Sequence, residues 1–274
     1  MPELPEVETI RRQLDRRLRG STLKKIELFR TGRERPTGKT FIDALTGQTI
    51  HSIDRRAKLL IWRLKNDQAV LAHLKMTGKF LFVDQGYEIT KHDAIRFTCE
   101  DAQGKEFFLV WNDVRKFGFM ELVSAEGLKA KLEAYGPEPL EATAQTLADC
   151  LRTPKTRLLK AALLNQGCIA GIGNIYADEA CHRVGIHPRR TLGALSDAER
   201  LRLAEAIQTV LSESLDQRGT SAHTYQDTSG SKGGFLSFLR VYGREGEPCR
   251  TCGTSIQKFR LVQRGTHICP KCQS

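Results

Sequence analysis

The sequence predicts an α+β fold in which strands dominate the first half of the chain and helices follow. Three observations lead to this prediction. Short runs of β-branched, aromatic and other apolar residues succeed one another up to residue 122. Helical spacing of apolar residues replaces them after residue 140, and two Cys-x-x-Cys pairs close the chain. Helices do not alternate with the strands, which argues against a doubly wound parallel sheet.

A helix over residues 5–18 is predicted to open the chain. Its apolar residues recur at spacings of three and four, and Gly20 follows as a stop. The segments after it are rich in Ile, Leu, Val and Phe, and several are separated by Gly, Asn or Asp turns. The predicted strands are residues 22–28, 48–53, 59–64, 69–74, 79–83, 94–99, 106–111 and 117–122. This succession favours a β-sandwich or a barrel.

The second half of the chain is predicted to be helical. Two prolines in residues 136–139 interrupt the strand pattern, so we place a domain boundary near residue 135. The clearest helix covers residues 196–217, because Ser196 and Glu199 have the spacing of a capping box and Gly219 follows its end. Residues 219–234 are rich in Gly, Ser and Thr and are predicted to form a mobile loop. Loops of this length are commonly functional.

The charge balance indicates a polyanionic partner. The 274 residues include 43 Lys and Arg against 32 Asp and Glu, a formal net charge of +11. The composition is that of a folded globular protein, with 40% hydrophobic and 27% charged residues. The longest uncharged stretch, residues 161–177, is interrupted by polar residues and glycines and is too short to span a bilayer. Since the acidic N-terminus has no apolar signal segment, we expect a cytoplasmic protein without a membrane partner.

Four of the eight cysteines have the spacing of a zinc site. They form two Cys-x2-Cys pairs, namely Cys249, Cys252, Cys269 and Cys272. Four thiolates from two tight turns give a closed tetrahedral site, which is typical of structural zinc and leaves no position for a substrate. We therefore expect one structural Zn²⁺. The alternative, two disulfides or four free thiols, is less consistent with a cytoplasmic chain.

Two further segments suit phosphate binding, and each has a structural alternative. Residues 240–274 contain seven basic residues against two glutamates, which fits either a phosphate-contacting element or a solvated face. Gly171-Ile-Gly-Asn174 precedes a helical pattern, and the N–H groups at such a helix start suit a phosphate oxygen. The alternative is a tight connection between two helices that Asn174 caps.

The N-terminus could carry covalent chemistry. Removal of Met1 would expose Pro2 as a secondary amine, which can condense with an aldehyde-like carbon to give an iminium ion. Glu3 and Glu6 are close enough in sequence to exchange protons with a substrate held there. The structural alternative is that the prolines stiffen the chain before a helix and the glutamates favour its positive end.

Five motifs together resemble the bacterial formamidopyrimidine-DNA glycosylases. They are MPELPEVET at residues 1–9, DVRKFG at 113–118, GIGNIY at 171–176, VYGR at 241–244 and RGTH at 264–267. They occur in order along the whole chain. The resemblance implies three domains: a catalytic β-sandwich at residues 1–135, a helix-two-turn-helix domain at 136–240 and a zinc finger at 241–274. It also implies that the loop at 219–234 covers a flipped base.

The resemblance implies a catalytic role for five residues. Pro2 would be the nucleophile that attacks C1′ of a damaged nucleoside, Glu3 the acid that assists opening of the sugar ring, and Glu6 a support of that site. Lys58 would act in β-elimination and Arg264 in δ-elimination and phosphate binding. The expected activity is removal of oxidised purines, such as 8-oxoguanine and formamidopyrimidines, followed by cleavage of the abasic strand.

The resemblance also implies contacts with damaged double-stranded DNA. Met76, Arg115 and Phe117 would fill the space that a flipped base leaves, because they offer an adaptable apolar side chain, a cation and an aromatic wedge. Without the motif, Met76 and Phe117 would be interpreted as core residues. The remaining contacts implied by the resemblance are His92, Lys155, Lys160 and Asn174. We expect the protein to act as a monomer at the bacterial nucleoid.

Three departures from the family pattern bear on the substrate. Ala57 stands beside Lys58 where the family usually has Gly, His223 stands where Arg is common, and Leu236 stands where Gln is frequent. The last two flank the loop expected to cover the flipped base. Two other functions therefore stay open: an endonuclease VIII-like preference for oxidised pyrimidines, and a non-catalytic DNA-binding zinc protein.

Overall fold

The chain forms two compact units in the computed structural model, which describes residues 1–222 and 224–274. The first unit comprises residues 1–133 and 218–233, and the second comprises residues 134–217 and 234–274. His223, at which the sequence departs from the family pattern, lies outside the described residues. Within the described ranges, none of the helices combines the length and the apolar character that a membrane crossing requires.

Two β-sheets build the first unit, as predicted. One sheet has the order β1-β7-β8-β6 and is antiparallel throughout. The other has the order β2-β9-β5-β4-β3, in which only the short β2–β9 pair is parallel. The strands are β1 (Thr22–Leu28), β2 (Glu34–Arg35), β3 (Ile50–Arg56), β4 (Leu59–Leu64), β5 (Ala69–His73), β6 (Gly78–Val83), β7 (Asp93–Glu100), β8 (Glu106–Asp113) and β9 (Phe119–Val123).

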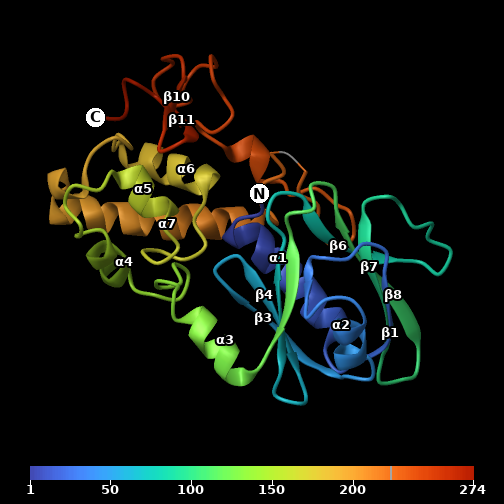
Figure 1. Cartoon of the computed structure of the whole chain (residues 1–274). Helices are drawn as coiled ribbons and strands as arrows, with labels where there is room; N and C mark the ends of the chain where they lie inside the picture. Colours follow the sequence, from blue (N-terminus) through green and yellow to red (C-terminus); the bar gives the residue numbers. More distant parts are fainter. Residues whose placement is uncertain (223) are drawn as a thin grey trace. The chain divides into compact units, whose positions relative to one another are not determined.

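The two sheets share one apolar core. Trp62 of β4 lies 5.3 Å from Phe80 of β6 and 5.4 Å from Phe97 of β7, measured between ring centroids. All three side chains are almost fully buried, so the contact joins the two layers of a sandwich. Helix α1 (Leu4–Leu18) packs against β3 and β4 (Figure 1). Its apolar face, which the sequence predicted, is buried in the same core.

Two short elements of this unit were not predicted. Strand β2 has only two residues, and α2 (Lys39–Leu45) has seven, which is too short for helical periodicity to be evident. Burial of Phe41 and Leu45 stabilises α2 against the core. A third helix, α3 (Ala125–Leu132), follows β9 and buries Leu128 on a small cluster formed with β4 and β5.

Helices dominate the second unit, again as predicted. They are α4 (Ala144–Cys150), α5 (Leu159–Leu164), α6 (Asn174–Val184) and α7 (Asp197–Asp216), with two 3₁₀ turns, η1 (Leu192–Ala194) and η2 (Phe235–Phe238). The long helix α7 packs against α4 and α6 (Figure 1). Ser196 and Glu199 form the predicted capping box at its start. Gly173, rather than Asn174, is the N-cap of α6.

A short β-hairpin, β10 (Gln257–Leu261) and β11 (Arg264–Ile268), lies near the C-terminus of this unit. Val262 and Gln263 form its turn, and both have positive φ, 43° and 59°. Positive φ at both central residues is the geometry of a tight two-residue hairpin turn. Arg264 is therefore the first residue after the turn.

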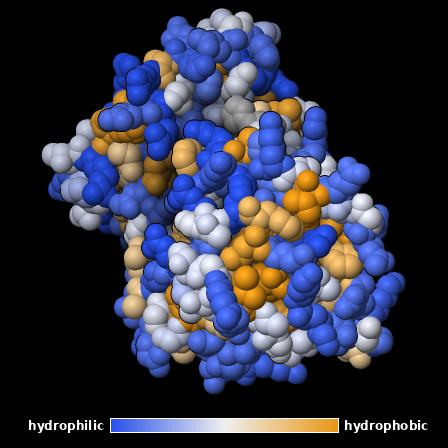
Figure 2. All heavy atoms as spheres, turned by 45° about the vertical axis from the view of Figure 1, so that its right-hand side comes forward, coloured by the Kyte–Doolittle hydropathy of each residue, from blue (hydrophilic) through white to orange (hydrophobic). Residues whose placement is uncertain are grey.

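Figure 2 shows a face with many hydrophilic residues and an area where hydrophobic residues gather. Among the described residues the exposed large apolar side chains are Met1, Phe29, Met76, Ile89, Val114, Phe117, Leu236, Phe238 and Val262. Two of them, Met76 and Phe117, are residues that the sequence assigned to a DNA contact.

Candidate active site and nucleic-acid interface

The start of α1 holds a pair of buried carboxyl groups directly after Pro2. Glu3 is the N-cap of the helix and is 3% exposed, whereas Glu6 is 1% exposed. The Glu3 backbone N–H donates to Glu6 Oε2 at 2.7 Å, and the backbone N–H of Thr220 donates to Glu6 Oε1 at 2.7 Å. Glu6 is thus fixed by two amides, while Glu3 stands beside the buried residue Pro2.

The approach of the loop to Glu6 depends on a glycine. Gly219 has φ +86°, and a Cβ atom there would lie 2.8 Å from Glu6 Oε1. Only glycine adopts this backbone without strain and leaves room for the carboxylate. Thr220 was not among the predicted site residues, because any residue type can supply a backbone donor. The one sequence feature that could have indicated this contact is the pair Gly219-Thr220, which follows the predicted helix.

The turn between β3 and β4 presents Lys58 to this cluster. Ala57 has φ +52°, a left-handed conformation that costs a non-glycine residue about 1–2 kcal/mol. Burial lowers the pKa of Lys58, and the neighbouring charges of Glu3 and Glu6 oppose that shift. The two carboxylates and the lysine therefore lie within electrostatic reach of one another. Ala57 retains the turn conformation that glycine adopts more readily.

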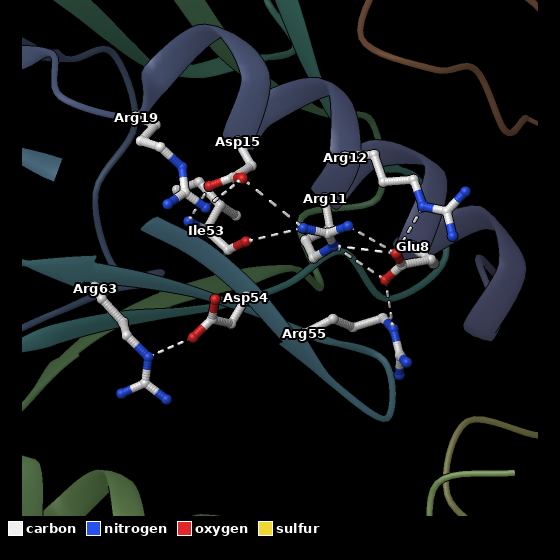
Figure 3. A network of polar contacts seen from close by, with 9 residues as sticks. All are labelled: Glu8, Arg11, Arg12, Asp15, Arg19, Ile53, Asp54, Arg55 and Arg63. Carbon is white, nitrogen blue, oxygen red and sulfur yellow. Dashed lines mark hydrogen bonds and ion pairs between the residues drawn. The ribbon is translucent and has the colours of Figure 1, made fainter. Parts of the chain in front are cut away.

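An ion-pair network ties this turn to α1 (Figure 3). Arg55 Nε donates to Glu8 Oε2 at 3.1 Å, and Arg55 Nη1 donates to the carbonyl oxygen of Ala57 at 3.0 Å. Glu8 also accepts from Arg11 and Arg12, each at 2.9 Å. Burial alone would raise the pKa of Glu8, but these arginines hold it below its usual range. Arg55 thus links the first turns of α1 to the residue that precedes Lys58.

A second contact in Figure 3 fixes the register of β3 on the helix. The Ile53 backbone N–H donates to Asp15 Oδ1 at 2.8 Å, and Arg19 Nη2 pairs with the other oxygen at 2.7 Å. Burial would raise the pKa of Asp15, yet these donors lower it. Helix α1 and strand β3 are therefore joined at two points along their length.

His73 lies near Lys58 and, like Thr220, was not among the predicted site residues. Its Nδ1 accepts a hydrogen bond from the Lys75 backbone N–H at 2.9 Å. Burial, followed by the charges of Lys75 and Lys58, lowers the pKa of His73 to about 3. The imidazole is thus neutral near pH 7 and adds no charge to the site.

Met76, Arg115 and Phe117 lie together, as the resemblance implied. Arg115 Nη1 contacts Met76 Sδ at 2.8 Å, and its guanidinium carbon lies 5.0 Å from the ring centroid of Phe117. Met76 is 41% exposed and Phe117 is 48% exposed, so neither is a core residue. We call these three residues the wedge.

Asp113 holds the loop that carries the wedge. Its carboxylate accepts from the Thr77 hydroxyl and from the backbone N–H groups of Arg115 and Gly118, the last at 2.7 Å. The Asp113 N–H in turn donates to the carbonyl oxygen of His92 at 2.9 Å. The half-buried His92 is thereby joined to the wedge loop through its backbone.

The predicted phosphate contacts of the second unit fall into two groups. Lys155 and Arg264 are exposed, as a phosphate contact requires. Asn174 is half-buried, and its Nδ2 donates to the carbonyl oxygen of Gly265 at 2.9 Å. The start of α6 is therefore joined to the residue that follows Arg264.

Lys160 lacks the exposure that its expected phosphate contact requires. Its side chain is completely buried and forms an ion pair with the equally buried Asp178 of α6. Asp178 also accepts from the His267 backbone N–H of β11 at 3.0 Å. We therefore correct the prediction: Lys160 neutralises a buried carboxylate that connects α5, α6 and the hairpin.

The C-terminal cysteines form a compact set of sulfur donors. Their four Sγ atoms lie within 4.8 Å of one another. Cys252 and Cys269 are 3.4 Å apart at sulfur, and Cys249 and Cys272 are 4.0 Å apart. A tetrahedral site with Zn–S bonds of about 2.3 Å requires sulfur separations of about 3.8 Å. The donor set therefore fits one zinc ion with a complete coordination sphere.

Comparisons with known proteins match three segments of the chain to family models. Residues 1–120 match the formamidopyrimidine-DNA glycosylase N-terminal domain, residues 135–226 match its H2TH domain, and residues 246–274 match a zinc finger found in FPG and IleRS. With the sulfur geometry, the last match identifies the four cysteines as ligands of one structural zinc ion.

Relatives and solved structures match over essentially the full length. A formamidopyrimidine-DNA glycosylase of Lactiplantibacillus plantarum is 42% identical over 98% of both chains. A complex of a Lactococcus lactis FPG mutant with Fapy-dG-containing DNA covers 100% of both chains with a TM-score of 0.92 and 35% identity. A complex of the wild-type Lactococcus lactis protein with oxidised-pyrimidine-containing DNA has a TM-score of 0.90, 34% identity and the same coverage.

Proposed function

The chain belongs to the formamidopyrimidine-DNA glycosylase family, and we propose that it is a base-excision repair enzyme that removes oxidised purines from duplex DNA and then cleaves the abasic strand. One observation carries the proposal. Two buried carboxyl groups, Glu3 and Glu6, follow the proline at the second position, and the buried Lys58 lies within electrostatic reach of both. A protein that only binds DNA needs none of that chemistry.

The proposed excision begins at Pro2 after removal of Met1. The nitrogen lone pair of Pro2 attacks C1′ of the damaged nucleoside, and the bond from C1′ to the base breaks with its electron pair leaving on the base. The departing base takes up a proton to replace the one that the Pro2 nitrogen loses. Glu3 donates a proton to the ring oxygen as the sugar opens, which leaves an iminium ion on Pro2. Glu6 keeps the start of α1 in place through its two amide contacts.

Strand cleavage would follow from the same intermediate. The iminium ion withdraws electrons from C2′, so loss of a C2′ proton expels the 3′ phosphate in β-elimination. Lys58 is proposed to act in this step, since burial lowers its pKa and favours the neutral amine. Arg264 is proposed to hold a phosphate during the second, δ-elimination. Zinc has no open coordination position and takes no part in bond breaking.

Base flipping gives the wedge its proposed role. A base must leave the helical stack before C1′ can be reached, and the vacated space must be filled. Met76 and Phe117 offer apolar surface, while Arg115 can donate hydrogen bonds to the orphaned base. We also propose the division into residues 1–135 for catalysis, 136–240 for DNA binding and 241–274 for the zinc finger, in a monomer that acts in the cytoplasm at the nucleoid.

The loop at residues 219–234 is proposed to cover the flipped base. Gln13 of α1 binds its second half, since Thr228 donates its N–H to Gln13 Oε1 at 2.9 Å and Gln13 Nε2 donates to Asp227 at 3.0 Å. The Phe82 N–H of β6 donates to the Thr228 carbonyl oxygen at 3.0 Å. The first half, which starts at Gly219, is bound to Glu6 through Thr220. Residues 220, 227 and 228 of the loop are thus attached to α1 and β6 within the first unit.

Borohydride trapping tests the proposal. The protein is incubated with duplexes that carry 8-oxoguanine, a formamidopyrimidine or an oxidised pyrimidine, and the iminium is reduced to a stable adduct. We expect covalent complexes with the two oxidised purines. Trapping mainly with the oxidised pyrimidine would favour the endonuclease VIII-like alternative, which the similarity to a complex with oxidised-pyrimidine DNA keeps open. Tight binding without any adduct would indicate a non-catalytic DNA-binding protein.

Removing an exposed cation should weaken binding in a salt-dependent way. We expect Lys155→Ala and Arg264→Ala each to lower the affinity for damaged and undamaged DNA alike and to reduce the slope of log K against log salt by about one. Fluorescence anisotropy titrations at several salt concentrations measure the slope. Glu133→Ala, a change at an exposed acidic residue outside the predicted contacts, is the control. A loss confined to damaged DNA would mean that the residue reads the lesion.

Removal of zinc should unfold the C-terminal segment and abolish DNA binding. Its apolar cluster consists of Val241, Ile256 and the cysteines, which is too small to hold a fold without the metal. Metal analysis should give one zinc per chain, and hydrogen exchange after chelation should show lost protection in residues 246–274. Unchanged protection after complete removal of the metal would contradict a structural role.

A further inference from the structure

One face of α6 contacts the zinc finger at three positions. Asn174, Asp178 and His182 are spaced four residues apart, which places them on the same side of a helix. Asn174 donates to the Gly265 carbonyl at 2.9 Å, and Asp178 accepts from the His267 N–H at 3.0 Å. These two contacts hold the β10–β11 hairpin. The third position, His182, reaches one of the metal ligands.

His182 lies directly against a zinc-binding sulfur. Its Nε2 is 3.6 Å from Cys249 Sγ, within the range of a hydrogen bond to sulfur. The two residues are 6% and 3% exposed, so water does not compete for the contact. Within the described part of the chain, the other ring nitrogen, Nδ1, has no hydrogen-bond partner. Among the described residues, the contact with sulfur is therefore the one hydrogen-bonding contact of the imidazole.

A zinc ion bound by four thiolates requires hydrogen-bond donors around its sulfur atoms. Four thiolates around Zn²⁺ carry a net charge of −2, which a buried environment tolerates only with N–H donors around the sulfurs. The Thr251 backbone N–H already donates to Cys249 Sγ at 3.4 Å from within the same turn. A donor from His182 adds one from outside the finger. It would stabilise the negative sulfur and fix its direction.

We propose that His182 donates a hydrogen bond from Nε2 to the zinc-bound sulfur of Cys249 and so anchors the metal site to α6. His182 is a positioning residue in this role, since it contacts neither DNA nor the reacting atoms. The inference rests on the zinc site and is independent of the proposed glycosylase activity. Its consequence is that the helix carrying Asn174 at its start also determines how tightly the metal is held.

The test compares two substitutions in the full-length zinc protein. His182→Phe fills the same space without a donor, whereas His182→Gln keeps an Nε2 donor at similar reach. We expect the Phe variant to hold zinc about 10–100-fold more weakly in competition with a chromogenic chelator. The Gln variant should stay close to the parent. In cobalt-substituted protein, the thiolate-to-metal charge-transfer band should shift in the Phe variant and be restored in the Gln variant.

A neighbouring residue supplies the control. Arg183 follows His182 in α6, but its guanidinium pairs with Glu213 of α7 at 2.7 Å, so Arg183→Gln should leave zinc retention unchanged. Parental zinc retention in the Phe variant would overturn the proposal. Equal losses in the Phe and Gln variants would also overturn it, because they would indicate packing rather than hydrogen bonding. If the Phe variant does not fold, His182→Met provides the same comparison.

Discussion

Replacing Lys160 with Ala is expected to lower the free energy of unfolding by about 3–5 kcal/mol. The ammonium of Lys160 and the carboxylate of Asp178 are both completely buried and pair with each other. Removal of the cation leaves the carboxylate without its counter-charge in an environment that solvates it poorly. Chemical denaturation followed by circular dichroism measures the loss.

A second variant separates loss of charge from loss of packing. Lys160→Met combined with Asp178→Asn removes both charges, keeps most of the volume and retains an oxygen for the His267 N–H. We expect this double variant to recover most of the stability that Lys160→Ala loses. Lys155→Ala, at an exposed position of the preceding segment, should change stability by less than about 0.5 kcal/mol. Parental stability of Lys160→Ala would contradict the buried pair.

The burial of Lys160 was not predicted from the sequence. The resemblance implied that Lys160 contacts phosphate at the helix-two-turn-helix, but it did not show which side of α5 this lysine occupies. One signal was available, because Lys160 lies within the apolar run Leu-Leu-Lys-Ala-Ala-Leu-Leu, and Asp178 interrupts the apolar start of α6. A single charge inside an apolar run of one helix, matched by an opposite charge in another, indicates a buried pair rather than a surface contact.

The strands were predictable for a local reason. Apolar residues and turn residues mark their ends, so the predictions for residues 22–28 and 59–64 coincide with β1 and β4. The contacts of Glu3 and Glu6 were predictable only in part. Glu3 and Glu6 are neighbours in sequence, whereas Thr220 reaches Glu6 through a backbone amide 214 residues away. Such contacts depend on tertiary structure and leave no pattern in the chain.

The same limit applies to Arg55. Its pairing with Glu8 and with the Ala57 carbonyl follows from the packing of β3 on α1. The structure shows that Arg55 is an internal brace with a side chain 5% exposed.

Blocking the amine of Pro2 is expected to abolish base excision while leaving DNA binding intact. An iminium ion requires a nitrogen lone pair, and an amide nitrogen lacks one because resonance delocalises it into the carbonyl. Protein that retains Met1 should therefore give no borohydride adduct. It should still bind damaged DNA, because Lys155, Arg264 and the wedge do not depend on that nitrogen. Anisotropy and trapping on one duplex measure the two properties separately.

Two substitutions divide the chemistry between nucleophile and acid. Pro2→Gly keeps a primary amine after Met1 removal and should retain some trapping. Glu3→Gln keeps the nucleophile but removes the proton donor, so it should slow excision of an oxidised purine by about 10²–10⁴-fold. It should affect cleavage of a pre-formed abasic site less, because that sugar already opens to an aldehyde. Equal losses on both substrates would assign Glu3 a structural role.

Mass spectrometry of the reduced complex identifies the nucleophile directly. Pro2 and Lys58 are the two candidate amines, and both are buried beside the same carboxylates. Burial lowers the pKa of Lys58, so both nitrogens are candidates for the attack on C1′. The number of carbon groups on each nitrogen distinguishes the two. The secondary amine of Pro2 gives an iminium ion with a permanent positive charge, whereas the imine of a lysine must first be protonated to withdraw electrons equally. We therefore expect the adduct on Pro2, and an adduct on Lys58 with Pro2 unmodified would refute the mechanism.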